Sequence, residues 1–165
     1  MPISSKIAGE SVEELPPEYL AEIGRVVVRW NMLEGYLDLS LINLLGKPIT
    51  DPRALVLFIH MAIPQKLDIL AAMVAALANE YPGLKRNYAN AAPLLKEAQR
   101  QRNAIIHAKW GMDNGVVMAS AISARGALKM SERPISLEEV ITASKSIFVA
   151  AEALYKLAWN PKWGE

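Results

Sequence analysis

The sequence predicts an all-α protein, an antiparallel four- to five-helix bundle with a small β-hairpin before the last helix. Apolar residues recur at helical spacing through several long segments. Proline or a capping residue precedes most of those segments, and glycine or proline follows them. Between residues 110 and 134 the character changes, because a turn signal separates short runs rich in valine and isoleucine.

The size, apolar content, charge and cysteine count of the chain limit which classes of protein it can belong to. The chain has 165 residues, enough for one domain, and 52% of them are apolar, which favours a substantial core and an apolar oligomer interface. A net charge of +1 excludes the strongly basic character of a generic nucleic-acid binder. With no cysteine and only two histidines, disulfides and thiolate metal sites are excluded, and we expect no metal and no cofactor.

The N-terminal residues 1–15 are polar and acidic, and we expect them to form a flexible arm that precedes a single helical domain over residues 16–160. They contain no apolar stretch of the secretory type. The longest purely apolar run, residues 69–78, is far shorter than the roughly 20 residues of a membrane span. We therefore expect a cytoplasmic protein that does not enter the membrane.

The first helix is predicted from Pro17 to Leu45, ending at Gly46. Its core-facing stripe is expected to contain Ile23, Val27, Trp30, Leu37 and Leu41. Glu34 falls on the same stripe, where a carboxylate is costly unless it is paired.

Thr50 and Asp51 offer an N-cap for the next element, with Pro52 just inside it. The run at 54–59 has the composition of a core segment. Pro64 predicts a break, followed by a helix from Pro64 to about Asn79.

A long helix from about Leu84 to Lys109 is predicted next, with a kink or a restart at Pro93. Turn signals at 113–115 and at 125–126 then favour a hairpin. Ser136 and Glu139 form a capping-box pattern, which starts a last helix from about Leu137 to Trp159.

The candidate functional residues lie at the end of the long helix. Asn103 and His107 are four residues apart, so they share one helix face, and Arg102 lies on its flank. An imidazole can act as general acid or base, and a guanidinium can stabilise charge developing on a phosphate. Asn103 can hold the imidazole tautomer or bind a phosphate oxygen. These groups suit metal-free RNA cleavage, for which a two-fold dimer would supply a second histidine.

The surroundings of this cluster are basic. Residues 84–110 contain six basic residues against the single acid Glu97. Lys96, Arg100 and Lys109 are therefore candidate contacts to RNA phosphates. The alternative is that these charges only solvate the outer face of the helix.

The segment Arg102-Asn103-Ala104-Ile105-Ile106-His107 resembles the motif of the HEPN superfamily, an arginine followed by a polar residue and then, after four to six intervening positions, a histidine. The segment 29–39 (RWNMLEGYLDL) is similar to that family's first helix, with Glu34 at its acidic position. The resemblance implies a symmetric dimer in which both arginines and histidines meet at the interface. Many relatives are metal-independent endoribonucleases, often toxins paired with an antitoxin or defence nucleases, and others have no known catalysis.

Two other assignments of the motif stay open. Arg100 also lies within the permitted spacing of His107, and Arg53 with His60 satisfies the same spacing elsewhere. We prefer Arg102 because Asn103 follows it in a basic segment that precedes the hairpin.

Three hypotheses follow. The chain is a homodimeric endoribonuclease, or it is a non-catalytic helical dimer that binds a protein or a nucleotide. Alternatively, the polar cluster is structural. In the structural hypothesis His107 serves the helix dipole, and Glu34 pairs with Arg102 or with another base across the bundle.

Overall fold

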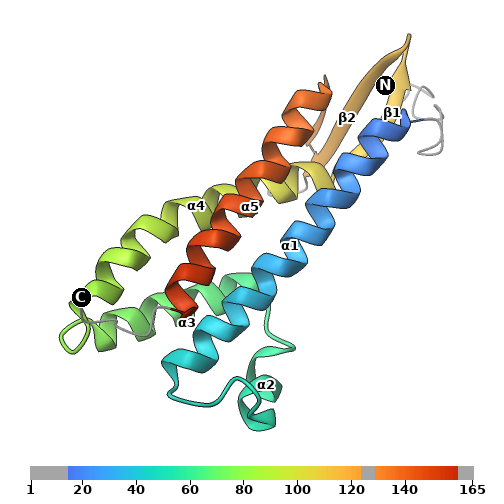
Figure 1. Ribbon diagram of the computed structural model, residues 1–165. Coiled ribbons are helices and arrows are strands. Elements are labelled where there is room, and N and C mark those ends of the chain that lie inside the picture. Colours follow the sequence, from blue (N-terminus) through green and yellow to red (C-terminus); the bar gives the residue numbers. More distant parts are fainter. Residues whose placement is uncertain (1–14, 124–128, 160–165) are drawn as a thin grey trace.

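The computed structural model describes residues 15–123 and 129–159. It contains five helices and a three-stranded antiparallel sheet placed before the last helix (Figure 1). In chain order they are α1 (Pro17–Leu44), α2 (Pro52–Phe58), α3 (Ile63–Leu77), α4 (Pro82–Ile106), β1 (Lys109–Asp113), β2 (Val116–Ser123), β3 (Lys129–Pro134) and α5 (Leu137–Trp159). The prediction of a mostly helical fold is confirmed, but the fold combines helices with a sheet and is not purely all-α.

Helix α1 begins and ends close to the predicted residues because local signals fix both ends. Pro17 occupies its first turn, where the missing N–H costs nothing. At the other end Gly46 adopts a φ of 65°, a conformation that glycine reaches without steric cost. The N–H of Gly46 donates to Asn43 O, and the N–H of Lys47 donates to Ile42 O, which is the Schellman pattern of helix termination.

Helix α5 lies beside α1, and the two run in the same direction (Figure 1). Arg29 donates to Ser144 Oγ near the start of α5, and Asn43 donates to Ala158 O near its end. Helix α4 runs opposite to both. The antiparallel arrangement is therefore correct for α4 and wrong for the α1–α5 pair, because α4 carries the chain back to the end of the bundle at which α1 begins.

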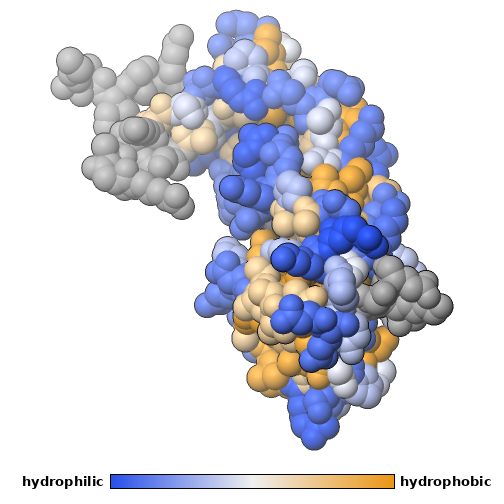
Figure 2. Space-filling model, turned by 90° about the vertical axis from the view of Figure 1, so that its left-hand side faces the viewer, coloured by the Kyte–Doolittle hydropathy of each residue, from blue (hydrophilic) through white to orange (hydrophobic). Residues whose placement is uncertain are grey.

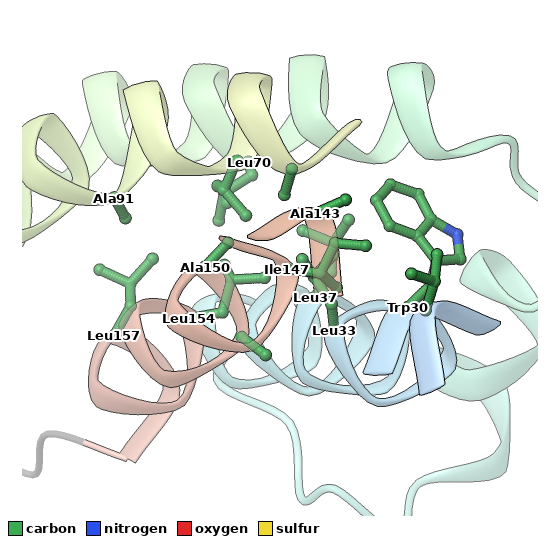
Figure 3. Close-up of a cluster of buried hydrophobic side chains, with 14 of the residues drawn as sticks. Trp30, Leu33, Leu37, Leu70, Ala91, Ala143, Ile147, Ala150, Leu154 and Leu157 are labelled. Carbon is green, nitrogen blue, oxygen red and sulfur yellow. The ribbon is translucent and has the colours of Figure 1, made fainter. Parts of the chain in front are cut away.

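The hydrophobic core lies where α1, α3, α4 and α5 meet (Figure 3). The residues labelled there are Trp30, Leu33, Leu37, Leu70, Ala91, Ala143, Ile147, Ala150, Leu154 and Leu157. The predicted stripe on α1 is correct at Trp30 and wrong at Val27, which is 42% exposed, whereas its neighbour Val26 is fully buried. Of the predicted arm, only Leu15 belongs to the described residues, and its side chain is buried in this core.

Helix α2 is more exposed to solvent than predicted. Of the run expected to be core, only Ala54 and Phe58 are buried, whereas Val56, Leu57 and Ile59 are 56–69% exposed. The chain breaks after Phe58, and α3 leaves at 120° to α2, so a seven-residue helix projects from the bundle (Figure 1). No single described helix meets the length and hydropathy expected of a membrane span, although α2 and α3 taken together do.

Helix α2 is capped at its N-terminus by Asp51, one of the two predicted residues. Asp51 Oδ1 accepts from the backbone N–H of Arg53 at 2.9 Å, and the Arg53 guanidinium reaches Asp51 Oδ2 at 2.8 Å. The side-chain hydrogen bond from Arg53, supported by the backbone bond, lowers the pKa of Asp51 from 3.8 to about 2.

This low pKa predicts an acid-dependent contribution to stability. Since the folded pKa lies below the unfolded one, the ionised cap stabilises the fold fully above about pH 4, and the contribution disappears as the pH falls toward 2. We expect the wild type to be more stable than Asp51→Asn at pH 6, with the difference vanishing near pH 2. Urea unfolding at several pH values measures this. A difference that does not change with pH would contradict the ionised cap.

Helix α4 is one continuous helix through Pro93, so the predicted restart is wrong. It begins two residues earlier than predicted and ends three residues earlier, because Lys109 already belongs to β1. The turn at Asn114 and Gly115, with φ of 50° and 81°, forms a two-residue hairpin loop as predicted. The third strand was not predicted, and the proposed turn at 125–126 lies outside the described residues.

Candidate functional site

The candidate site forms where α4 gives way to the sheet. His107 is the C-cap residue, and its backbone N–H donates to Asn103 O. The indole N–H of Trp110 donates to Ile105 O at 3.0 Å, which satisfies one of the last carbonyl groups of the helix. This bond ties the first strand to the end of α4 and fixes the backbone that carries the cluster.

Three predicted residues, Arg102, Asn103 and His107, come together as one hydrogen-bonded cluster. Arg102 Nη1 lies 2.8 Å from His107 Nε2 and 3.2 Å from Asn103 Oδ1. Asn103 and His107 are exposed, whereas Arg102 is half-buried. The cluster therefore presents an imidazole and an amide to solvent, with a guanidinium partly beneath them.

Trp30 forms the floor of this cluster. The Arg102 Cζ atom lies 5.4 Å from the centroid of the Trp30 ring, within the range of a cation–π contact. The Trp30 side chain comes from α1 and is only 7% exposed, so its position is fixed by the core. The sequence pattern places this tryptophan on the core-facing stripe of α1. Nothing in its spacing indicates that it meets Arg102.

No carboxylate in the described part of the chain neutralises the charge of Arg102. Within residues 15–123 and 129–159 no Asp or Glu lies at ion-pair distance from it. Its Nε atom is buried and has no hydrogen-bond partner among the residues that the structure describes. A buried donor without an acceptor reduces the stability of the fold by about 1–3 kcal/mol. A contribution to stability therefore does not explain the position of this guanidinium.

Arg100 occupies a different environment. It forms a two-point contact with Glu97, at 2.6 and 2.8 Å, on the exposed face of α4. The hydrogen bond from Arg100, followed by one from Gln101, lowers the pKa of Glu97 to about 2. Of the two arginines that satisfy the motif spacing, Arg102 is the one that contacts His107.

The remaining predicted phosphate contacts are spread along the surface. Lys96 is exposed on α4, and Lys109 is exposed at the start of β1. Neither forms an ion pair with any residue that the structure describes. Both ammonium groups are thus available to an anion, but neither touches the Arg102 cluster.

Glu34 pairs with a base other than Arg102. Lys66 of α3 places its Nζ 2.7 Å from Asp38 Oδ1 and 3.8 Å from Glu34 Oε1. The Lys66 residue is 1% exposed, so this is a buried ammonium held by two partly exposed carboxylates. Of the two predicted partners for Glu34, the second, a base across the bundle, is the one present.

The rival pair Arg53 and His60 does not form a site. The Arg53 guanidinium is held by Asp51, and His60 is exposed in the break between α2 and α3. No hydrogen bond joins the two side chains, although both belong to the described residues. Their spacing in sequence is therefore a coincidence.

The fold and this cluster define a mainly helical protein with a hydrogen-bonded Arg–Asn–His group where a helix meets a three-stranded sheet. Among the described residues no group of three or more His, Asp or Glu is arranged to hold a metal ion. No family model, no curated protein and no solved structure matches the chain.

Proposed function

We propose that this chain is a HEPN-like endoribonuclease that acts as a homodimer and needs no metal ion. The observation that carries the proposal is the 2.8 Å contact between the Arg102 guanidinium, which no described carboxylate neutralises, and the exposed His107 imidazole. A general base and a cation beside it are the two elements that phosphodiester cleavage by a ribose hydroxyl requires.

The reaction is an internal transfer at phosphorus. His107 takes the proton from the ribose 2′-hydroxyl, whose oxygen attacks the adjacent phosphorus. The bond to the 5′-oxygen breaks, and that oxygen receives a proton. Arg102 stabilises the negative charge that builds up on the phosphate oxygens, and Asn103 positions the guanidinium through its Oδ1. The products end in a 2′,3′-cyclic phosphate and a 5′-hydroxyl.

A dimer supplies the second proton carrier. In the cluster, His107 Nε2 accepts a hydrogen bond from Arg102, so this imidazole is suited to the role of general base. The same imidazole cannot also protonate the leaving group at that moment. His107 of the partner subunit would act as the acid if the two clusters meet across a two-fold axis. Lys96 and Lys109 would hold the phosphates on either side, and Arg100 would add less because Glu97 already engages it.

The setting implied by the HEPN resemblance is a cytoplasmic toxin or a defence nuclease, restrained by an antitoxin or by another regulatory protein. The exposed aliphatic residues of α2 offer such a protein a contact surface.

The direct test is cleavage of single-stranded RNA in excess EDTA. We expect the rate to be the same with and without the chelator, and the 5′ fragments to carry cyclic phosphate ends, because the protein's own side chains perform every step. Mass spectrometry of the fragments identifies the ends, and the activity must follow the protein through two chromatographic separations. Loss of activity in EDTA, fragments with 3′-hydroxyl ends, or no cleavage of a broad set of RNAs would contradict the proposal.

A second candidate is a non-catalytic dimer that binds a partner protein. It is favoured by the projecting helix α2, on which Leu55, Val56, Leu57 and Ile59 are 42–69% exposed. Figure 2 shows hydrophobic surface in the lower half of the molecule, at the height of α2 and α3 in Figure 1. Monomeric proteins rarely expose so much aliphatic side chain together.

The same candidate includes a nucleotide-binding form. A groove of about 730 Å³ runs between α4 and α5, within the size range of small-molecule sites. Asn87 and Asn90 line one wall, and Glu152, Lys156 and Trp159 line the other. The lining therefore offers hydrogen-bonding amides, one acid, one cation and an aromatic side chain. The groove lies near the opposite end of α4 from His107, roughly 25 Å away at 1.5 Å per residue.

A further inference from the structure

The direction of the Arg102–His107 hydrogen bond fixes the state of the imidazole. A guanidinium has donors only and keeps its charge in proteins, so Arg102 must donate and His107 Nε2 must accept. The imidazole is therefore neutral, with its proton on Nδ1. The lone pair that a general base needs is already occupied by the arginine.

Trp30 lies directly against the guanidinium of Arg102. The guanidinium lies over the indole face, with 5.4 Å between Cζ and the ring centroid. Its hydrogen bonds to both cluster residues use the same nitrogen, Nη1, and Nε has no acceptor. Because a ring face carries no net charge, a cation that lies on it still presents its full positive charge to an incoming anion.

We propose that Trp30 is a positioning residue that holds Arg102 as a cap over His107 Nε2, and that a phosphate group draws the guanidinium away and so uncovers the base. This proposal rests on the proposed function, because it describes how the same site would be regulated. No proton moves in the uncapping step. Arg102 keeps its charge, His107 keeps its Nδ1 proton, and Nε2 becomes free to take the proton of the 2′-hydroxyl.

With this cap, the Nε2 lone pair of His107 becomes available only when substrate is bound. Without phosphate, the hydrogen bond from Arg102 occupies the lone pair of His107 Nε2. Water or another hydroxyl group then has no free base to which it can give a proton. A phosphodiester offers the guanidinium charged oxygens, which form stronger hydrogen bonds than an imidazole nitrogen does. Binding and activation then occur together.

The test is ¹⁵N NMR of the two imidazole rings in the full-length protein. The chain has two histidines, and exposed His60 serves as an internal reference. Without ligand we expect His107 to show the Nδ1-protonated tautomer alone. Addition of inorganic phosphate should shift the His107 Nε2 resonance in a saturable way and leave His60 unchanged.

Two variants separate positioning from packing. Trp30→Phe keeps an aromatic face, so the single tautomer of His107 should persist. Trp30→Leu keeps an apolar side chain without a ring face, so His107 should become a mixture of the two neutral tautomers.

A tautomer mixture at His107 in the wild type would overturn the proposal, as would an unchanged His107 spectrum in a folded Trp30→Leu protein. If Trp30→Leu does not fold, the wild-type phosphate titration and Trp30→Phe decide. These signals do not depend on RNA cleavage. A capped, phosphate-responsive His107 in a protein that cuts no RNA would refute the nuclease and leave the cap standing.

Discussion

Replacing His107 with alanine is expected to lower the rate of RNA cleavage by about 10²–10⁴-fold, the usual contribution of a positioned general acid or base. The imidazole is exposed, and its side-chain hydrogen bond is to Arg102. Its removal should therefore leave the fold and the melting temperature almost unchanged. Initial rates on a single-stranded RNA in EDTA, together with thermal unfolding followed by circular dichroism, measure both effects.

His60 provides the matched control for this variant. It is the chain's other histidine, it is exposed, and it lies in the break between α2 and α3, away from the Arg102 cluster. His60→Ala should keep the wild-type rate. Equal rates for His107→Ala and wild type would remove the catalytic assignment, and equal losses in both variants would point to a general effect of removing histidine.

Replacing Asp38 with alanine is expected to reduce the free energy of unfolding by about 3 kcal/mol, since it leaves a buried ammonium without its nearest carboxylate. Lys66 is 1% exposed, and its Nζ lies 2.7 Å from Asp38. Breaking a buried pair from one side costs more than the pair itself contributes. Urea unfolding of wild type and variant provides the comparison.

Two further variants make this stability prediction specific. Glu34→Ala should cost less than about 1 kcal/mol, because Glu34 lies 3.8 Å from Lys66 and its side chain is 36% exposed. The double variant Asp38→Ala/Lys66→Met removes the stranded charge and should recover most of the loss. An Asp38→Ala variant as stable as the wild type would contradict the role given to this buried ion pair.

Much of the helical framework could be predicted because its signals are local. The ends of α1 follow from Pro17 and Gly46, and the start of α5 follows from Ser136, whose Oγ accepts from the N–H of Glu139. The two-residue turn at Asn114 and Gly115 is equally local. In each case the residues that determine the boundary lie within a few positions of it.

The features that could not be predicted depend on distant contacts. Strand β3 has the sequence KMSERP, which lacks a clear alternation, and it becomes a strand because β2 supplies hydrogen-bonding partners. The parallel packing of α1 and α5 is set by the path of the whole chain. The run at 54–59 has a core composition, but a helix of seven residues presents only one side to α1.

The candidate site shows the same division. Arg102, Asn103 and His107 lie within six residues on one helix, so helical geometry predicts that they can meet. Trp30 and Lys66 come from other helices, and no spacing in the sequence relates them to Arg102 or Glu34. Polar partners across a bundle become visible only once the helices have been placed.

The central claim is that two such clusters converge in a dimer to form one RNA-cleaving centre, and cysteine cross-linking tests it most directly. The chain has no native cysteine, so a thiol introduced at exposed Ala104, beside Asn103, is the only one present. We expect Ala104→Cys, treated with a short bis-maleimide, to give a covalent dimer efficiently, and Val56→Cys on the projecting helix α2 to give none. A monomer in solution, or cross-linking at Val56 and none at Ala104, would contradict a shared active centre.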